Sequence, residues 1–385
     1  MTTDPQAPLR LLTPGPTAVP AAVLEEIGRP VIHHRTQQFR DVFAEVSQRL
    51  GRVFRTLSPV LTISGSGTTA YEAAQVSLFE PGRKALTAAG GKFGERWQDV
   101  YRAYGVEQVQ INVPWGQAVS ADAIGEALDE HGDVSVVTVV HSETSTATAC
   151  DIKAIAAVVQ KHDALLIVDG ITAVGALPLE MDAWGIDVVV TGSQKALMLP
   201  PGLGFVGLGE RAMARLERIE PRGCYNLDLR RWLKSWQAND VPFTPPINLI
   251  RGLRAALEMI ETEGLENVWS RSAGMAKATR AAMKAMGLEL VSQCPSDSVT
   301  GTFYPPGVDD STFRAALRDR FRMQLAGGQS GRGGDWKNKI FRVSHMGYIN
   351  MQDMLDAIDA VETLLIEAGI NIESGRGKKA AQAAQ

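Results

Sequence analysis

Lys195 stands where an apolar run gives way to prolines and glycines. The run "GIDVVVTGSQ" before it is typical of a strand inside a parallel sheet, and "ALMLPPGLGF" follows it. Parallel α/β sheets bind ligands at the carboxyl ends of their strands, so the lysine is predicted to lie where a ligand binds. The ordinary alternative is a solvated lysine on a loop. The residues at the other predicted strand ends distinguish a ligand-binding lysine from a solvated one.

A carboxylate occupies the corresponding place on the preceding predicted strand. Asp169 follows the apolar residues of "ALLIVDG". A desolvated carboxylate is costly to leave unpaired, so we expect Asp169 to have a partner. Capping of a following helix is the common role of such an aspartate and is the alternative here.

A glycine-rich turn lies between the predicted strand "PVLTIS" and the helix that begins within "TAYEAAQVSLF", and it contains Ser66, Gly67 and Thr68. Backbone N–H groups in such a turn, together with the N-terminus of the helix, favour an anion, most often phosphate. The segment "GSGTTA" also satisfies the dinucleotide pattern GxGxxA, but "KALTAAGG" lacks the acidic residue expected about 20 positions later. A helix cap without a ligand is the structural alternative.

Together these three features indicate pyridoxal 5′-phosphate. Its phosphate needs backbone amides, its pyridinium nitrogen needs an anionic partner, and its aldehyde forms a Schiff base with a lysine. An anion-binding turn, a carboxylate and a lysine occur in this order on predicted strand ends. The sequence therefore predicts a pyridoxal-phosphate site that uses Lys195 and Asp169.

The composition is that of an ordinary globular protein. The chain has 385 residues, of which 45% are hydrophobic and 21% charged, with a formal net charge of −4. These values give no reason to expect nucleic acid or an anionic membrane surface as a partner. The 3 cysteines are far apart and the 6 histidines lack metal-ligand spacing, so we expect no disulfides, no metal and a cytoplasmic location. No apolar run approaches the ~20 residues that span a bilayer.

Predicted strands and helices alternate along the first part of the chain, which is typical of an α/β fold with a mostly parallel sheet flanked by helices. After about residue 245, a long amphipathic helix and further helices mixed with strands indicate a smaller α+β domain. We therefore predict an N-terminal segment over 1–20, a large domain over 21–248, a small C-terminal domain over 249–372 and a flexible tail over 373–385.

The motifs "TPGP", "GSGTTAYEAA", "LLIVDG" and "TGSQKAL" resemble those of the class V aminotransferases, which are fold-type I pyridoxal-phosphate enzymes. The resemblance continues through "TPPINLIRGLRAALEMIETEGLENV" and "KIFRVSHMG", where the chain is similar to the serine–glyoxylate and alanine–glyoxylate aminotransferases. It extends from about Leu11 to Ile370. It implies the fold-type I architecture, a pyridoxal-phosphate transaminase, and a homodimer with the active site at the subunit interface.

The resemblance gives three residues a role in the chemistry. It implies that Lys195 is the Schiff-base lysine and then moves the proton between Cα and C4′. It implies that Asp169 bonds to the pyridine nitrogen. It also implies that Arg342 binds the substrate's α-carboxylate, because the planar guanidinium matches a carboxylate in a bidentate way.

Other positions match cofactor or substrate contacts of the family. The resemblance assigns Ser66, Gly67, Thr68, Phe93, Thr144 and Gln194 to the cofactor, and Gly15 with Thr144 to the substrate. Thr244 matches a residue that reaches the phosphate of the neighbouring subunit, whereas Val241 stands where some relatives have a tyrosine. Phe93 matches a ring-stacking aromatic that is often tryptophan, and an ordinary core phenylalanine is the alternative.

The implied reaction transfers the amino group of a small L-amino acid, serine or alanine, to glyoxylate or pyruvate by a ping-pong mechanism. A single carboxylate-binding arginine favours such a small donor. An aspartate donor would need a second cation, for which Arg35 and Arg332 are the candidates.

Three other functions are alternatives. Cysteine desulfuration needs a nucleophilic cysteine on a mobile loop, but the loop from Ala326 to Asp335 has none, and Cys294 precedes a proline. Some members of the family are described as subunits of larger redox assemblies, so a non-catalytic subunit is a second alternative. A dinucleotide-binding module without this cofactor is the third, and the missing acidic residue counts against it.

Overall fold

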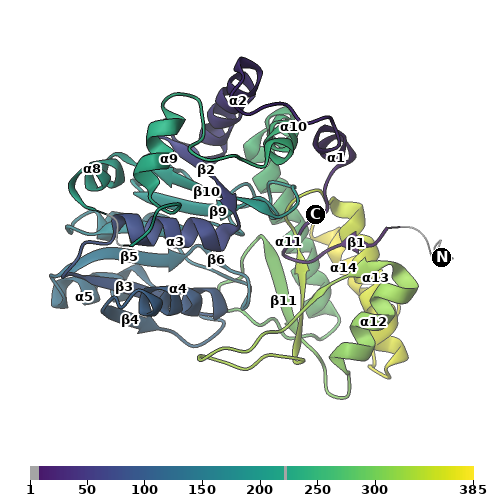
Figure 1. Ribbon diagram of the computed structural model, residues 1–385. Coiled ribbons are helices and arrows are strands. Elements are labelled where there is room, and N and C mark those ends of the chain that lie inside the picture. The colour runs from purple at the N-terminus through teal and green to yellow at the C-terminus, as the bar shows by residue number, and fades with distance from the viewer. Residues whose placement is uncertain (1–7, 221–222) are drawn as a thin grey trace.

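The computed structural model describes residues 8–220 and 223–385, so part of the predicted N-terminal segment lies outside the described residues. The main sheet has seven strands in the order β2-β10-β9-β8-β5-β3-β4 (Figure 1). β10 runs antiparallel to β2 and β9, and the remaining neighbours pair in parallel, as the sequence predicts. The strands are β2 (Val60–Gly65), β10 (Gly202–Leu208), β9 (Val188–Gly192), β8 (Leu165–Asp169), β5 (Val134–Val140), β3 (Lys84–Ala89) and β4 (Gln108–Asn112).

Helices cover both faces of this sheet because its strands are apolar on both sides. In β5, Val136 and Val140 pack with one set of helices, whereas Val137 and Val139 pack with the other. The first set is α3 (Gly67–Leu78), α4 (Lys92–Ala103), α8 (Glu210–Arg218) and α9 (Leu229–Trp236). The second set is α2 (Gln37–Phe54), α5 (Ala121–Glu130) and α6 (Ile152–Val159), with the short α7 (Met181–Trp184) beside them.

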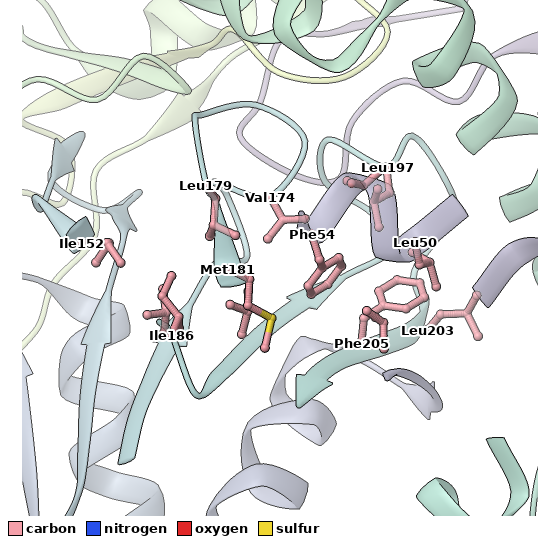
Figure 2. Packing of buried hydrophobic residues seen from close by; sticks show 14 of the residues in the cluster. Leu50, Phe54, Ile152, Val174, Leu179, Met181, Ile186, Leu197, Leu203 and Phe205 are labelled. Carbon is pink, nitrogen blue, oxygen red and sulfur yellow. The ribbon is translucent and has the colours of Figure 1, made fainter. Parts of the chain in front are cut away.

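The packing around β10 places the N-terminus of α3. On one face, Phe205 of β10 and Phe54 and Leu50 of α2 are fully buried side by side (Figure 2). On the other face, Gly204 lets α3 approach closely, because a Cβ atom there would lie 2.6 Å from Ser66 O. The start of α3 is therefore held directly against the sheet.

The long helix α10 (Ile247–Glu263) differs from the predicted domain division. It packs on α1 (Ala21–Ile27) and α2, and its apolar face belongs to the same core as α2. The start of α11 (Leu265–Ala285) also packs in that core, whereas the rest of α11 belongs to a separate core that includes Leu12 from the N-terminal segment. Amphipathic periodicity shows which face of a helix is buried but not which neighbour covers it.

The C-terminal part, residues 265–385, combines helices with small sheets (Figure 1). β11 and β13 flank β14 in an antiparallel sheet, and β1 pairs with β12 in parallel. In residues 8–220 and 223–385 no helix has the length and apolar character needed to cross a membrane. The remaining elements are β1 (Arg10–Leu11), β6 (Ser142–Glu143), β7 (Thr148–Ala149), β11 (Val299–Phe303), α12 (Asp310–Phe321), β12 (Met323–Gln324), β13 (Ala326–Gly327), β14 (Ile340–Ser344) and α13 (Met351–Glu367).

The end of the chain is helical, so the predicted flexible tail is wrong for most of its length. Helix α14 (Arg376–Ala383) buries Gly377 and Ala381 against α11 and α13. The carboxylate of Glu362 in α13 accepts the N–H groups of Gly375 (2.9 Å) and Gly377 (2.8 Å). The small residues that suggested a frayed end instead let this helix pack closely.

Candidate active site

One cavity at the carboxyl edge of the main sheet brings together most of the residues singled out in the sequence. Those that line it are Ser66, Gly67, Thr68, Phe93, Thr144, Asp169, Gln194 and Lys195. The sequence analysis did not identify its other lining residues, which are Tyr71, Arg96, Val140, Ser142, Ile171 and Thr172. The polar groups after β2, β5, β8 and β9 therefore surround one space.

Lys195 lies in a tight turn that the N-terminal segment crosses. Its Nζ donates to Pro14 O (2.7 Å), and Thr17 Oγ1 donates to Lys195 O (2.7 Å). The φ of +120° at Gly15 favours glycine, and a Cβ atom there would lie 2.2 Å from Nζ and displace the amine of the lysine. Ser193 Oγ closes the turn by donating to Pro200 O (2.8 Å).

The amine of Lys195 is held in a largely desolvated place. Burial lowers its pKa to about 8, and the charges of Arg342 and Arg96 lower it further, whereas Asp169 opposes the shift. A substantial fraction of the amine is therefore neutral near physiological pH. The burial that causes this shift favours a cavity lysine over a solvated one.

Asp169 is buried at the end of β8, with 1% of its surface exposed. Its Oδ1 accepts the N–H of Ile171 (3.0 Å), and Trp97 Nε1 donates to Oδ2 at 3.4 Å. Burial raises its pKa to about 7, although the Ile171 bond and the Lys195 charge oppose the rise. A cationic partner at this edge of the cavity would favour the ionised carboxylate.

The N-terminus of α3 lies at the cavity and is capped by its own side chains. Ser66 Oγ accepts the N–H of Thr68 (3.2 Å), and Thr69 Oγ1 accepts the N–H of Ser66 (3.1 Å), so the first turn has a capping box. A Cβ atom on Gly67 would lie 2.4 Å from Ile171 Cδ1. The helix dipole and its N–H groups favour a negative charge here.

Thr144 and Thr172 form a directed pair in the cavity wall. Thr172 Oγ1 donates to Ser142 O (2.9 Å) and lies 2.9 Å from Thr144 Oγ1. Because a threonine has one hydroxyl hydrogen, Thr144 must be the donor in this pair. The hydroxyl of Thr144 is therefore fixed in direction.

Arg342 lies on β14 and is buried. Its Nε and Nη2 donate to Gly327 O (3.0 and 2.8 Å), and Nη1 donates to Thr144 O (2.7 Å). These bonds use three of the five N–H groups of the guanidinium, and Arg342 is not among the residues that line the cavity. Burial lowers the pKa of Arg342 to about 10, so the guanidinium stays charged at neutral pH.

Helix α4, which the sequence analysis did not predict, positions Phe93. Buried Glu143 accepts the N–H groups of Phe93 (3.1 Å) and Gly94 (2.9 Å) and so caps the start of this helix. Burial raises the pKa of Glu143. Arg96 lies one turn further on, 4.9 Å from the centre of the Phe93 ring, and the spacing in "KFGER" was the available signal.

Three residues that the sequence suggested lie away from the cavity. Thr244 is exposed and does not line it. Arg35, a candidate second cation, pairs with Asp240 at 2.8 Å. Arg332, the other candidate, pairs with Asp99 at 2.6 Å.

The family model for aminotransferase class-V matches residues 11–358 of the chain. The chain belongs to the class V aminotransferases. This family assignment agrees with the predicted family, the α/β fold and a pyridoxal-phosphate-dependent transaminase.

Relatives over nearly the full length carry different names. The chain is 40% identical to a "Soluble hydrogenase 42 kDa subunit" from Anabaena cylindrica, covering 97% of both chains. It is 35% identical to an L-aspartate–glyoxylate aminotransferase from Paracoccus denitrificans (97% and 95% covered) and 34% identical to a serine–glyoxylate aminotransferase from Methylorubrum extorquens (96% and 94%). The crystal structure of pyridoxamine–pyruvate aminotransferase from Mesorhizobium loti superposes with a TM-score of 0.92 at 31% identity, covering 100% and 99%.

Proposed function

We propose that this class V aminotransferase moves the amino group of a small L-amino acid, serine or alanine, to glyoxylate or pyruvate, with pyridoxal 5′-phosphate as its cofactor. The observation that carries the proposal is the meeting of Lys195, Asp169 and the N-terminus of α3 around one cavity. A serine–glyoxylate aminotransferase among the relatives supports the acceptor and one of the donors.

The residues around the cavity fit this cofactor. Asp169 offers the buried anionic partner that a pyridinium nitrogen needs, and the first N–H groups of α3 suit a phosphate. The Oε1 atom of Gln194 is buried without a partner in the described chain, which leaves this amide free for a ligand. Exchange of its O and N positions would present the NH2 group to a phosphate.

Each polar residue has a distinct task in the proposed reaction. When bound, the cofactor supplies an aldehyde that condenses with amines and a ring that accepts the electron pair released at the substrate's Cα. Lys195 takes the proton from Cα and returns it, which its pKa of about 8 permits near neutral pH. Asp169 stabilises a proton on the pyridine nitrogen, and Arg342 orients the substrate through its carboxylate.

The arrangement of cations favours a donor with one carboxylate. Arg35 and Arg332 are occupied by Asp240 and Asp99 outside the cavity, so neither offers a free second cation. Aspartate is the second candidate donor because Arg96 lines the cavity and one relative is named for this donor.

A non-catalytic subunit is the alternative that the name of the Anabaena relative raises. A structural subunit has no need of a lysine with a lowered pKa beside a buried carboxylate. The cavity residues therefore favour catalysis.

The test is glycine formation from glyoxylate with L-serine, L-alanine or L-aspartate, measured by mass spectrometry on protein loaded with the cofactor. We expect serine or alanine to be used faster than aspartate, with the parallel reciprocal plots of a ping-pong mechanism. Lys195→Ala should abolish the product. A preference for aspartate would replace the donor assignment, and no product from any donor or acceptor would refute the proposed function.

We also propose a homodimer with the active site at the subunit interface. Thr244 is exposed and lies outside the cavity of its own chain, which suits a residue that acts across an interface. Light scattering should give twice the 41.5 kDa of one chain. A monomer with full activity would contradict this assembly.

A further inference from the structure

A glycine-rich loop, residues 327–336, reaches from the C-terminal part of the chain back to α4. The N–H of Gly331 donates to Gly334 O (2.8 Å), and the N–H of Trp336 donates to Gln329 O (2.9 Å), so the loop closes on itself. In Figure 1 this segment extends in yellow-green from the C-terminal part toward α4 and β4. Neither the reaction nor the cavity described above accounts for it.

Glu95 of α4 is the centre of the contact with this loop, and its side chain is 3% exposed. Oε1 accepts the N–H of Gly333 (2.8 Å) and Nε1–H of Trp115 (3.2 Å), and Oε2 accepts the N–H of Arg332 (2.8 Å). A buried carboxylate is costly without such donors, and two of them belong to the loop backbone. The backbone N–H groups of the loop therefore bond to the buried carboxylate of Glu95 on α4.

The shape of the loop is matched to the same carboxylate. A Cβ atom on Gly331 would lie 2.4 Å from Glu95 Oε2, and one on Gly333 would lie 2.7 Å from Trp115 Nε1. Only glycine permits this approach at both positions. The Arg332 side chain adds a bond from Nη2 to Glu95 O (2.9 Å).

Gly327, where β13 ends and the loop begins, bonds to Arg342. Gly327 O accepts from both Nε and Nη2 of the guanidinium, while Nη1 donates to Thr144 O. The loop is thus bonded to Arg342 at its start and to α4 near its tip. Helix α4 also carries Phe93 into the cavity, so the loop connects the two.

We propose that Glu95 is a positioning residue for substrate binding: it fastens the loop 327–336 to α4 and so fixes the guanidinium of Arg342 relative to Phe93. The inference rests on the proposed function in one respect, that Arg342 binds the substrate's carboxylate. A displacement of about 1 Å in a substrate-orienting group can cost on the order of 100-fold in rate.

Two variants break the contact from opposite sides. Glu95→Gln replaces one acceptor oxygen with an NH2 group that faces N–H donors. Gly331→Ala leaves the carboxylate but places a methyl group against it. We expect each to raise the KM for the wild type's preferred donor by roughly tenfold or more, with kcat within about threefold of wild type. The double variant should be no worse than either single variant.

Cofactor affinity and hydrogen exchange distinguish positioning from a general loss of structure. We expect unchanged cofactor affinity in both variants and faster amide exchange over residues 328–336. Glu258→Gln, an exposed carboxylate on α10, and Gly132→Ala, which has open space around it, are the matched controls and should behave as wild type.

The outcomes separate this proposal from the proposed function. An unchanged KM in both variants, or a loss of cofactor affinity as large as the change in KM, would overturn the role of Glu95. An inactive wild type would refute the proposed function alone, because hydrogen exchange of the loop still tests the contact. In that case, unchanged exchange in both variants would overturn the proposal as well.

Discussion

At the scale of single residues, the chemistry depends on how burial changes two charges. The sequence places Lys195 and Asp169 on neighbouring strand ends, and the structure brings both to one cavity. Burial moves the pKa of the lysine down to about 8 and that of the aspartate up to about 7. Strand patterning predicts these positions, but both pKa shifts follow from desolvation, and the charges of Arg342 and Arg96, which are distant in sequence, add to the shift of the lysine.

The lowered pKa of Lys195 predicts how the protein without cofactor captures pyridoxal phosphate. Only the neutral amine reacts, so the capture rate should rise with pH and level off above about pH 8. An unperturbed lysine would continue to gain reactivity to about pH 10. Stopped-flow absorbance measures this rate, and division by the rate for Nα-acetyl-lysine, whose amine has an ordinary pKa, removes the titration of the cofactor itself. The ratio should be constant below about pH 8 and fall above it, and a ratio that stays constant to pH 10 would contradict the lowered pKa.

At the scale of elements, two helix starts shape the cavity, and the sequence identified only one. The cap of α3 is recognisable because glycines and hydroxyl residues follow a strand. Helix α4 begins without a side-chain cap of its own, since Glu143, distant in sequence, receives its first N–H groups. Such a cap from another segment leaves no signal at the helix start itself, although the spacing in "KFGER" could have indicated Arg96 beside Phe93.

Because α3 packs closely on β10 at Gly204, a substitution at this residue tests whether the start of α3 binds the cofactor. Gly204→Ala places a methyl group against Ser66 O and should displace the first turn of α3. We expect cofactor affinity to fall by roughly tenfold or more, as measured by fluorescence titration. Gly274→Ala in α11 has open space around it and should leave the affinity unchanged. Equal affinities in the two variants would show that the start of α3 does not hold the phosphate.

At the scale of the whole molecule, the alternation of predicted strands and helices indicated the α/β class and the parallel sheet. It did not indicate how the N-terminal and C-terminal parts of the chain pack together. Helix α10 belongs to the first core, and the N-terminal segment contributes Leu12 to the second. The sequence shows which residues are apolar enough to be buried, but contacts between distant segments determine the core in which each of them packs. The helical end of the chain was missed for the same reason.

Removal of residues 373–385 tests the packing of that end. Truncation uncovers the apolar side of α13 and takes two N–H donors from Glu362, so we expect a loss of about 2 kcal/mol or more in unfolding free energy. Urea denaturation followed by circular dichroism measures this loss. Removal of Ala384 and Gln385 alone is the control and should have little effect. No change on the longer truncation would support the flexible tail that the sequence suggested.

The central claim is that Lys195 is the residue to which the cofactor is covalently attached, and borohydride reduction followed by peptide mass spectrometry tests it most directly. Protein incubated with pyridoxal phosphate is reduced and digested, and the peptides are searched for the added group. We predict one modified peptide, with the group on Lys195, and none at that site if L-serine or L-alanine is added in excess before reduction. Modification spread over surface lysines, or an unmodified Lys195, would contradict the account.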